Sequence, residues 1–146
     1  MRKKAFTIIE LILVFAVIGL LGTLTVPMYQ SFQITTTRQT FTSELIANLH
    51  RAKLKALSAE NDDSWSLAIG ANQKITIFKG VDFQNREQSY DEATDIPTGV
   101  TIESQFSQII FSKVSGLPNT NGTITLTDST GQSQTITINP QGTVDY

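Results

Sequence analysis

The chain has 146 residues, of which 40% are hydrophobic and 16% are charged, a composition typical of one folded domain and not of a disordered chain. It contains no cysteine, which excludes disulfides, thiolate metal sites and cysteine-dependent catalysis. The formal net charge is −2, but residues 60–146 hold four basic residues against eleven acidic ones. This net charge of −7 opposes binding to a polyanion such as nucleic acid.

The first thirty residues contain a long apolar segment after a basic start. Arg2, Lys3 and Lys4 come first, and no charged residue lies between Glu10 and Arg38. As a helix, residues 6–25 would span about 30 Å, which is about the hydrocarbon thickness of a bilayer. The basic flank predicts that the N-terminal end stays in the cytoplasm and that the rest of the chain lies outside it.

Two simpler interpretations of this segment leave part of it unexplained. A cleaved secretory signal peptide needs a small-residue site after the apolar run, and residues 25–30 offer none. A plain single-span anchor accounts for the length and the basic flank. It does not account for Glu10, because a charge at the middle of a bilayer costs about 2.5–3.5 kcal/mol and somewhat less near the edge.

The string FTIIE at residues 6–10, with its basic leader, apolar helix and Pro27, resembles the class III signal of type IV pilins and type II secretion pseudopilins. The resemblance implies that prepilin peptidase cuts between Ala5 and Phe6 and methylates the new amine of Phe6. It also implies that Glu10 is the assembly residue and that Pro27 kinks the helix. Ala5 departs from the family pattern, in which glycine usually precedes the cut.

Physical arguments agree with these roles. Cleavage would free a positive amine at Phe6, and Glu10 is the acidic residue near it in apolar surroundings, where an unpaired charge is costly. The amine of one subunit pairing with Glu10 of another would set their axial register. Pro27 removes a helix hydrogen bond, so we expect a kink or local melting within residues 22–28.

An amphipathic continuation of the helix is predicted over residues 28–59. Apolar positions recur there at steps of three and four, at Phe41, Leu45, Leu49, Ala52 and Ala56. A single helix over residues 6–59 would be about 80 Å long. We therefore expect its second half to pack on the domain and its first half to be buried in the membrane or among neighbouring subunits, with a possible bend at residues 33–37.

Strand-like alternation follows the acidic run at residues 60–63, where the helix is expected to end. Residues 65–69 and 75–77 predict a hairpin with a turn at residues 70–72. Residues 80–95 are interpreted as an acidic loop. Further antiparallel strands are expected at residues 100–103, 109–114, 123–127, 135–139 and 143–146.

A narrower resemblance, to the minor pseudopilins called GspH/FimT, covers about residues 38–146. It rests on segments such as LHRAKLKA at residues 49–56, PTGV at residues 97–100 and GTITL at residues 122–126. It implies an α+β fold in which two antiparallel sheets, sandwich-like, pack on the helix. The expected organisation is a leader at 1–5, a membrane or filament-core helix at 6–27, its amphipathic continuation at 28–59 and an exported β-rich domain at 60–146.

Other candidate sites are weaker. His50 is the sole histidine and is interpreted as a helix-surface residue, since it has no second histidine to act with. Trp65 alternates in phase with the apolar residues of its strand and is interpreted as core. The basic cluster Arg51, Lys53 and Lys55 is interpreted as a solvated face or a contact with an acidic neighbour.

The carboxylates of the acidic loop also suggest a calcium site. Oxygen ligands would come from Asp82, Glu87, Asp91, Glu92 and Asp95, but their spacing matches no regular calcium loop, so a solvated loop is preferred.

We interpret the chain as a non-enzymatic structural subunit without cofactor or metal, a minor pseudopilin or minor type IV pilin. Its expected partners are prepilin peptidase, other pilins or pseudopilins in a filament, and the cytoplasmic membrane that it crosses once with its C-terminal domain outside. Nucleic acid is disfavoured by charge. A major pilin, or a binding subunit of a DNA-uptake pilus, stays open as an alternative.

Overall fold

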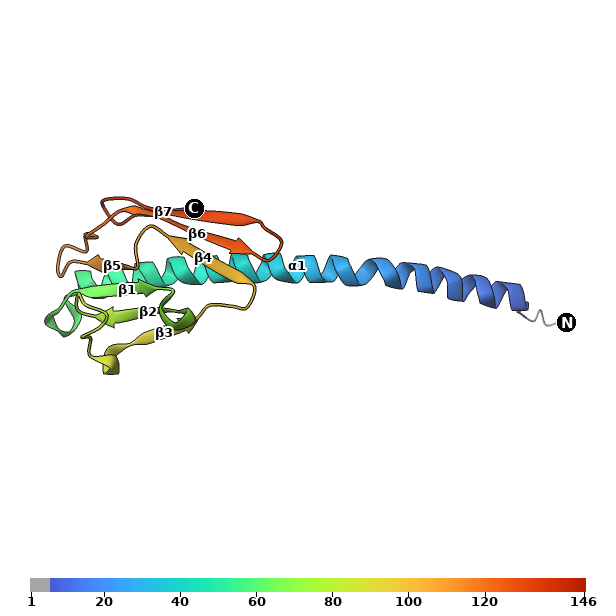
Figure 1. Cartoon of the computed structure of the whole chain (residues 1–146), viewed down its shortest axis with the longest axis horizontal. Helices are drawn as coiled ribbons and strands as arrows, with labels where there is room; N and C mark the ends of the chain where they lie inside the picture. Colours follow the sequence, from blue (N-terminus) through green and yellow to red (C-terminus); the bar gives the residue numbers. More distant parts are fainter. Residues whose placement is uncertain (1–5) are drawn as a thin grey trace.

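One long helix organises the molecule. In the computed structural model, which describes residues 6–146 and the side chains of all of these except 23–28 and 30, helix α1 runs from Ile8 to Leu57. Its 50 residues correspond to about 75 Å. Two β-sheets surround its C-terminal half, and its N-terminal half projects from them (Figure 1). The prediction of a helix over residues 6–59 is thus confirmed to within two residues at each end.

The buried face of α1 is the face predicted from the sequence. Five apolar side chains on it are at most 1% exposed: Phe41, Leu45, Leu49, Ala52 and Ala56. They belong to one core cluster with residues of both sheets. Because most helix stability in proteins comes from packing of an amphipathic face, burial of this face is what holds the second half of the helix in place.

The first sheet is antiparallel and has the strand order β3-β2-β1-β5. Its strands are β1 (Trp65–Ile69), β2 (Lys74–Lys79), β3 (Glu92–Asp95) and β5 (Gln108–Phe111). The predicted hairpin is confirmed as β1 and β2, paired from Trp65↔Lys79 to Ile69↔Ile75. Short 3-10 helices lie in the connections, namely η1 (Glu60–Asp62), η2 (Ala71–Gln73) and η3 (Gln88–Tyr90).

The second sheet is also antiparallel, with the order β4-β6-β7-β8. Its strands are β4 (Val100–Ser104), β6 (Gly122–Asp128), β7 (Ser133–Ile138) and β8 (Val144–Asp145). Each lies within or close to a predicted strand. Together the two sheets and the helix confirm the expected α+β fold with two antiparallel sheets packed on the helix.

The interpretation of residues 80–95 as loop throughout is wrong at its end, where β3 forms the edge of the first sheet. This strand pairs with β2 from Lys74↔Asp95 to Ile77↔Glu92. It is polar, yet helix α1 supplies partners for it: Asn48 donates to the hydroxyl of Thr94 at 3.3 Å, and Lys55 pairs with Glu92 at 3.1 Å. Long-range polar contacts thus stabilise a strand that lacks an apolar pattern.

The rest of that segment covers the outer face of the first sheet. Phe78 of β2 is 0% exposed and lies on the face away from the main core, where its ring meets that of Phe83 at 5.4 Å in an edge-to-face arrangement. Arg86 lies over the Phe83 ring and is held by Asp91 at 2.8 Å. The loop therefore supplies a small second apolar layer.

Candidate functional site

The projecting half of α1, defined here as residues 8–37, extends beyond the sheets for most of its length (Figure 1), and its last turns lie beside the connection from β3 to β4. Among its residues whose side chains are described, none is buried, and Arg38 is the first buried one of the described residues. Twelve large apolar side chains from Phe6 onward are 48–83% exposed: Phe6, Ile8, Ile9, Leu11, Ile12, Leu13, Val14, Phe15, Val17, Ile18, Leu20 and Leu21. An apolar surface of this extent on one helix marks a surface that another apolar body covers.

The residues predicted to act in processing and assembly lie at the start of this helix. Ala5 is outside the described residues. Phe6 is 83% exposed, and the backbone N–H of Glu10 donates to the hydroxyl of Thr7, the N-cap, at 3.4 Å. Among the described residues the Glu10 carboxylate has no ion-pair partner. Helix α1 is assigned without interruption through residues 22–28, and the kink at Pro27, whose side chain is not described, stays a prediction.

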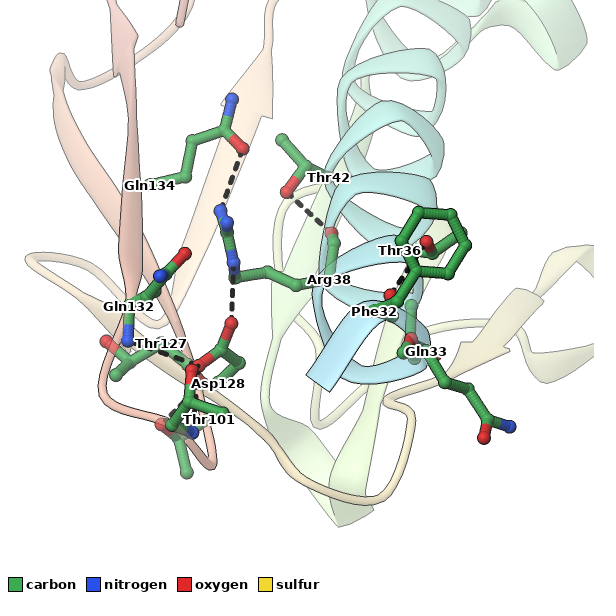
Figure 2. Close-up of polar contacts among 12 residues, drawn as sticks. Phe32, Gln33, Thr36, Arg38, Thr42, Thr101, Thr127, Asp128, Gln132 and Gln134 are labelled. Atoms are coloured by element: carbon green, nitrogen blue, oxygen red, sulfur yellow. Dashed lines mark hydrogen bonds and ion pairs between the residues drawn. The ribbon is translucent and has the colours of Figure 1, made fainter. Parts of the chain in front are cut away.

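A buried ion pair links the helix to the second sheet directly after the last residue of the projecting half. Arg38 and Asp128 have side chains that are 8% and 0% exposed, and Nε of Arg38 donates to Oδ2 of Asp128 at 3.0 Å (Figure 2). Nη1 of Arg38 also donates to Gln134 of β7 at 3.1 Å. The sequence offered no indication of this contact, because its partners are 90 and 96 positions apart along the chain.

Asp128 is held as a carboxylate by the turn that follows β6. The hydroxyl and the backbone N–H of Thr130 donate to Oδ1, as does the backbone N–H of Gln132. The hydrogen bond from the Thr130 hydroxyl, followed by that from Arg38, lowers the pKa of Asp128, and these bonds outweigh burial, which acts in the opposite direction. The buried carboxylate of Asp128 is stable because Arg38 neutralises its charge and the turn after β6 supplies its other hydrogen bonds.

A hollow of about 340 Å³ lies beside the helix next to this junction. Its lining is largely apolar and aromatic, with Tyr29, Phe32 and Phe41 on α1 and Pro97 on the connection from β3 to β4. Tyr29 and Phe32 are 68% and 71% exposed. Glu44 is the charged side chain in the lining. The remaining lining residues are Gln33, Thr36, Thr37 and Thr40.

The carboxylates considered for calcium are distributed among different partners. Asp91 pairs with Arg86, Asp95 with Lys74, and Glu92 with Arg51 and Lys55. The remaining two have contacts of their own: Glu87 lies 3.8 Å from the amine of Lys79, and Asp82 accepts hydrogen bonds from Gln84 and Asn85. Across the part of the chain that the structure describes, no group of three or more metal-binding side chains converges.

The basic cluster on the helix contacts this same domain, so its interpretation as a contact with a neighbour is wrong. The solvated face is confirmed for Arg51, whose side chain is 57% exposed, and not for the half-buried Lys53 and Lys55. Arg51 pairs with Glu92, and Lys53 donates to the carbonyls of Gln141 and Gly142 at 2.8 and 3.0 Å. Lys55 lies over the Trp65 ring, 4.1 Å from its centroid. Burial alone would lower the pKa of Lys55, but its bonds to acidic partners raise it above the ordinary value.

The other two minor interpretations are confirmed. Trp65 is 1% exposed and lies in the core, with its indole N–H donating to the carbonyl of Glu60 at 2.9 Å. His50 is exposed on the helix surface.

Within the residues whose placement is described, no helix is at once long enough and apolar enough to cross a membrane. The single membrane span at residues 6–27 stays a prediction.

The fold and the projecting helix define a subunit of the pilin class, and comparison with known proteins identifies the family. Residues 34–142 match the family model described as type II transport protein GspH, and the chain belongs to this family. The crystal structure of the type IV minor pilin FimU from Pseudomonas aeruginosa is similar, with a TM-score of 0.58 and 17% identity over 73% of this chain and 90% of that one. No curated protein sequence matches. At this identity the FimU match shows the pilin fold.

This family membership confirms the resemblance stated above and makes the chain a structural subunit of the pilin and pseudopilin class. Such subunits associate with other pilins or pseudopilins in membrane-associated filament systems.

Proposed function

We propose that the chain is a minor pseudopilin or minor type IV pilin that prepilin peptidase cuts between Ala5 and Phe6 and methylates at Phe6. Residues 6–27 then hold it in the cytoplasmic membrane with its domain outside, until it enters a filament with other pilin-type subunits. The observation that carries this proposal is the start of the projecting half of α1, where the large apolar side chains from Phe6 to Leu21 are 48–83% exposed. Membership of the GspH family supports the same role.

Glu10 has a specific part in this proposal. Its carboxylate lies on the first turns of an otherwise apolar helix, and the next charge along the sequence is Arg38. In apolar surroundings that carboxylate is stable only if a cation neutralises it. The amine freed at Phe6 is such a cation, either its own or that of an incoming subunit, and pairing between subunits would set their axial register.

The charge distribution of the domain supports a protein partner over nucleic acid. Residues 60–146 have a net charge of −7, and the helix cations Arg51 and Lys55 are paired within the domain. A polyanion would therefore meet a repulsive surface.

Processing is tested by co-expressing the chain with a prepilin peptidase and measuring the N-terminus by mass spectrometry. We expect a mature chain that begins with a methylated Phe6. Replacing Ala5 by leucine should block the cut, while replacing Ala5 by glycine should preserve it. A mature chain that starts after Thr25, or an uncleaved chain alone, would refute the assignment.

Assembly is tested with Glu10→Val and Glu10→Asp. Glu10→Val makes the helix more apolar, so membrane insertion and cleavage should be retained while crosslinking to partner subunits is lost. Glu10→Asp keeps the charge and should retain part of the crosslinking. Normal assembly of Glu10→Val would show that the carboxylate has no assembly role.

A further inference from the structure

A larger hollow of about 800 Å³, the loop hollow, lies between the loop after β2 and the adjoining ends of β1 and β5. Three parts of the chain line it: the end of β1 with η2, residues 82–88 of the loop, and the start of β5. Its volume is within the range of about 300–1,000 Å³ that is typical of ligand sites. It is distant in sequence from the helix residues to which processing and assembly are assigned.

The loop that forms one wall of this hollow is fixed to the sheet. The side-chain amide of Gln108 donates to a loop carbonyl at 2.9 Å, and the Phe83 ring packs on that of Phe78 at 5.4 Å. Arg86 pairs with Asp91 at 2.8 Å and donates from Nη1 to the carbonyl of Phe83. Because the protein's own contacts hold this wall in place, a ligand would not have to order the loop on binding.

Neutral hydrogen-bonding groups gather in the lining. Four exposed polar side chains there have no hydrogen-bond partner among the described residues: Asn72, Gln84, Gln88 and Ser107. Each side-chain amide offers donors and an acceptor, and the hydroxyl offers both as well. The end of β1 adds apolar atoms to the same lining. The hollow can therefore form several neutral hydrogen bonds beside a small apolar surface.

The charges of the lining disfavour an ionic ligand. Asp82 and Arg86 are its charged residues, and Arg86 is already neutralised by Asp91. An anion such as phosphate would thus meet the carboxylate of Asp82 and no uncommitted cation. The oxygens of Asp82 already accept hydrogen bonds from the backbone of Gln84 and the side chain of Asn85, so a cation would find little there. An uncharged ligand fits this balance.

The edge of the sheet beside the hollow is not open to a peptide strand. Strand β5 is that edge, and a peptide that extended the sheet would need its outward backbone groups. Those of Ile110 are taken by Asn119: the N–H of Ile110 donates to the Asn119 side chain, and the N–H of Asn119 donates to the carbonyl of Ile110, at 2.8 Å each.

We propose that the loop hollow binds a neutral oligosaccharide. Sugar hydroxyls act as donors and acceptors at once, which matches the amides and the hydroxyl of the lining, and the C–H faces of a sugar ring can contact the apolar atoms of β1. This inference goes beyond the proposed filament role and does not depend on it, because binding is measured on the purified chain.

Binding is tested on the full-length chain in a polyoxyethylene detergent, which has no sugar headgroup. Maltotriose, cellotriose and tri-N-acetylchitotriose are each titrated, and saturation-transfer NMR gives a Kd for each. We expect at least one of them to bind with a Kd of about 1 mM or lower. If none of the three binds at about 10 mM, the proposal is overturned.

Variants of the lining locate the bound sugar. Gln84→Ala and Gln88→Ala should each weaken binding roughly three- to tenfold, because each removes one amide that bonds the ligand. The matched control is Gln132→Ala, an exposed glutamine between β6 and β7 that does not line the hollow, and its Kd should be unchanged. Ser107→Trp places an indole in the hollow and should abolish binding. Thermal unfolding checks that each variant folds.

Three results of this series would count against the site. Unchanged binding by Ser107→Trp would place the sugar elsewhere and overturn the proposal. Equal losses in Gln88→Ala and Gln132→Ala would do the same. Trialanine binding as tightly as the best of the three sugars would identify a peptide site in place of a saccharide site. None of these results bears on cleavage at Ala5 or on assembly through Glu10, which have their own measurements.

Discussion

Replacing Leu49 by alanine tests whether the second half of α1 is part of the domain core. Leu49 is 1% exposed and belongs to the same buried cluster as Leu67 of β1 and Ile124 of β6. Because both sheets contact the helix, the site has little freedom to close around the removed atoms. We expect a loss of about 3–4 kcal/mol in the free energy of unfolding, within the range known for buried leucines.

The matched control is Leu54→Ala on the same helix, where the side chain is 62% exposed. This change should alter stability by no more than about 0.5 kcal/mol, because little burial is lost and alanine favours helix.

Both changes are measurable in the fragment 33–146, which keeps the buried face of the helix and lacks most of the exposed apolar surface. We expect this fragment to be soluble and monomeric and to unfold cooperatively, with no effect of a chelator. For a chain of this size, Leu49→Ala should lower the Tm by roughly 12–16 °C. Equal losses in the Leu49 and Leu54 variants would refute the packing of α1 as a core element.

Gly116→Ala should destabilise the domain by about 1–3 kcal/mol, because φ is +60° there and an added Cβ would lie 2.5 Å from Cγ of Leu57. The control is Gly131→Ala, where φ is also positive at +83° but no atom lies within 4 Å of an added Cβ. Chemical denaturation should show a smaller loss of unfolding free energy for this variant, and equal losses would contradict the clash between residue 116 and Leu57. The pKa of Asp128 is lower in the folded state than in the unfolded state, mainly because the Thr130 hydroxyl donates a hydrogen bond to its carboxylate. The carboxylate therefore stabilises the fold above about pH 4, and this contribution is lost as the pH falls further. Asp128→Asn should therefore flatten the acid limb of stability against pH, and an unchanged limb would contradict the role of this carboxylate.

Local patterns predicted most elements correctly where one face of an element is buried. The spacing of Phe41, Leu45 and Leu49 defined the core face of the helix, and alternation defined the β1–β2 hairpin. The pattern failed at β3, whose Glu92 and Thr94 are held by side chains of the helix and not by an apolar face. It failed again for the contact of Arg51 and Lys55 with Glu92, since a partner 41 and 37 positions away leaves no trace in a local window.

The candidate site also has a part that the sequence predicted and a part that it could not predict. The leader, Phe6 and Glu10 form a contiguous string, so the sequence alone predicted where processing and assembly act, and their roles stay predictions. The sequence could not predict the hollow beside α1, because Pro97 lies next to Phe32 and Phe41 only after the connection from β3 to β4 has folded against the helix.

By itself, the sequence determined an apolar helix with one early carboxylate, the phase of its core face, and the presence of antiparallel strands, because each depends on residues within a few turns or a few strand positions of one another. Only the tertiary structure decided that β5 joins β1 in one sheet while β4 joins β6 in the other, and that Arg38 turns inward to Asp128. Those outcomes depend on which distant segments meet as the chain closes around its core, where a charge becomes stable only after its partner and the surrounding hydrogen bonds are in place.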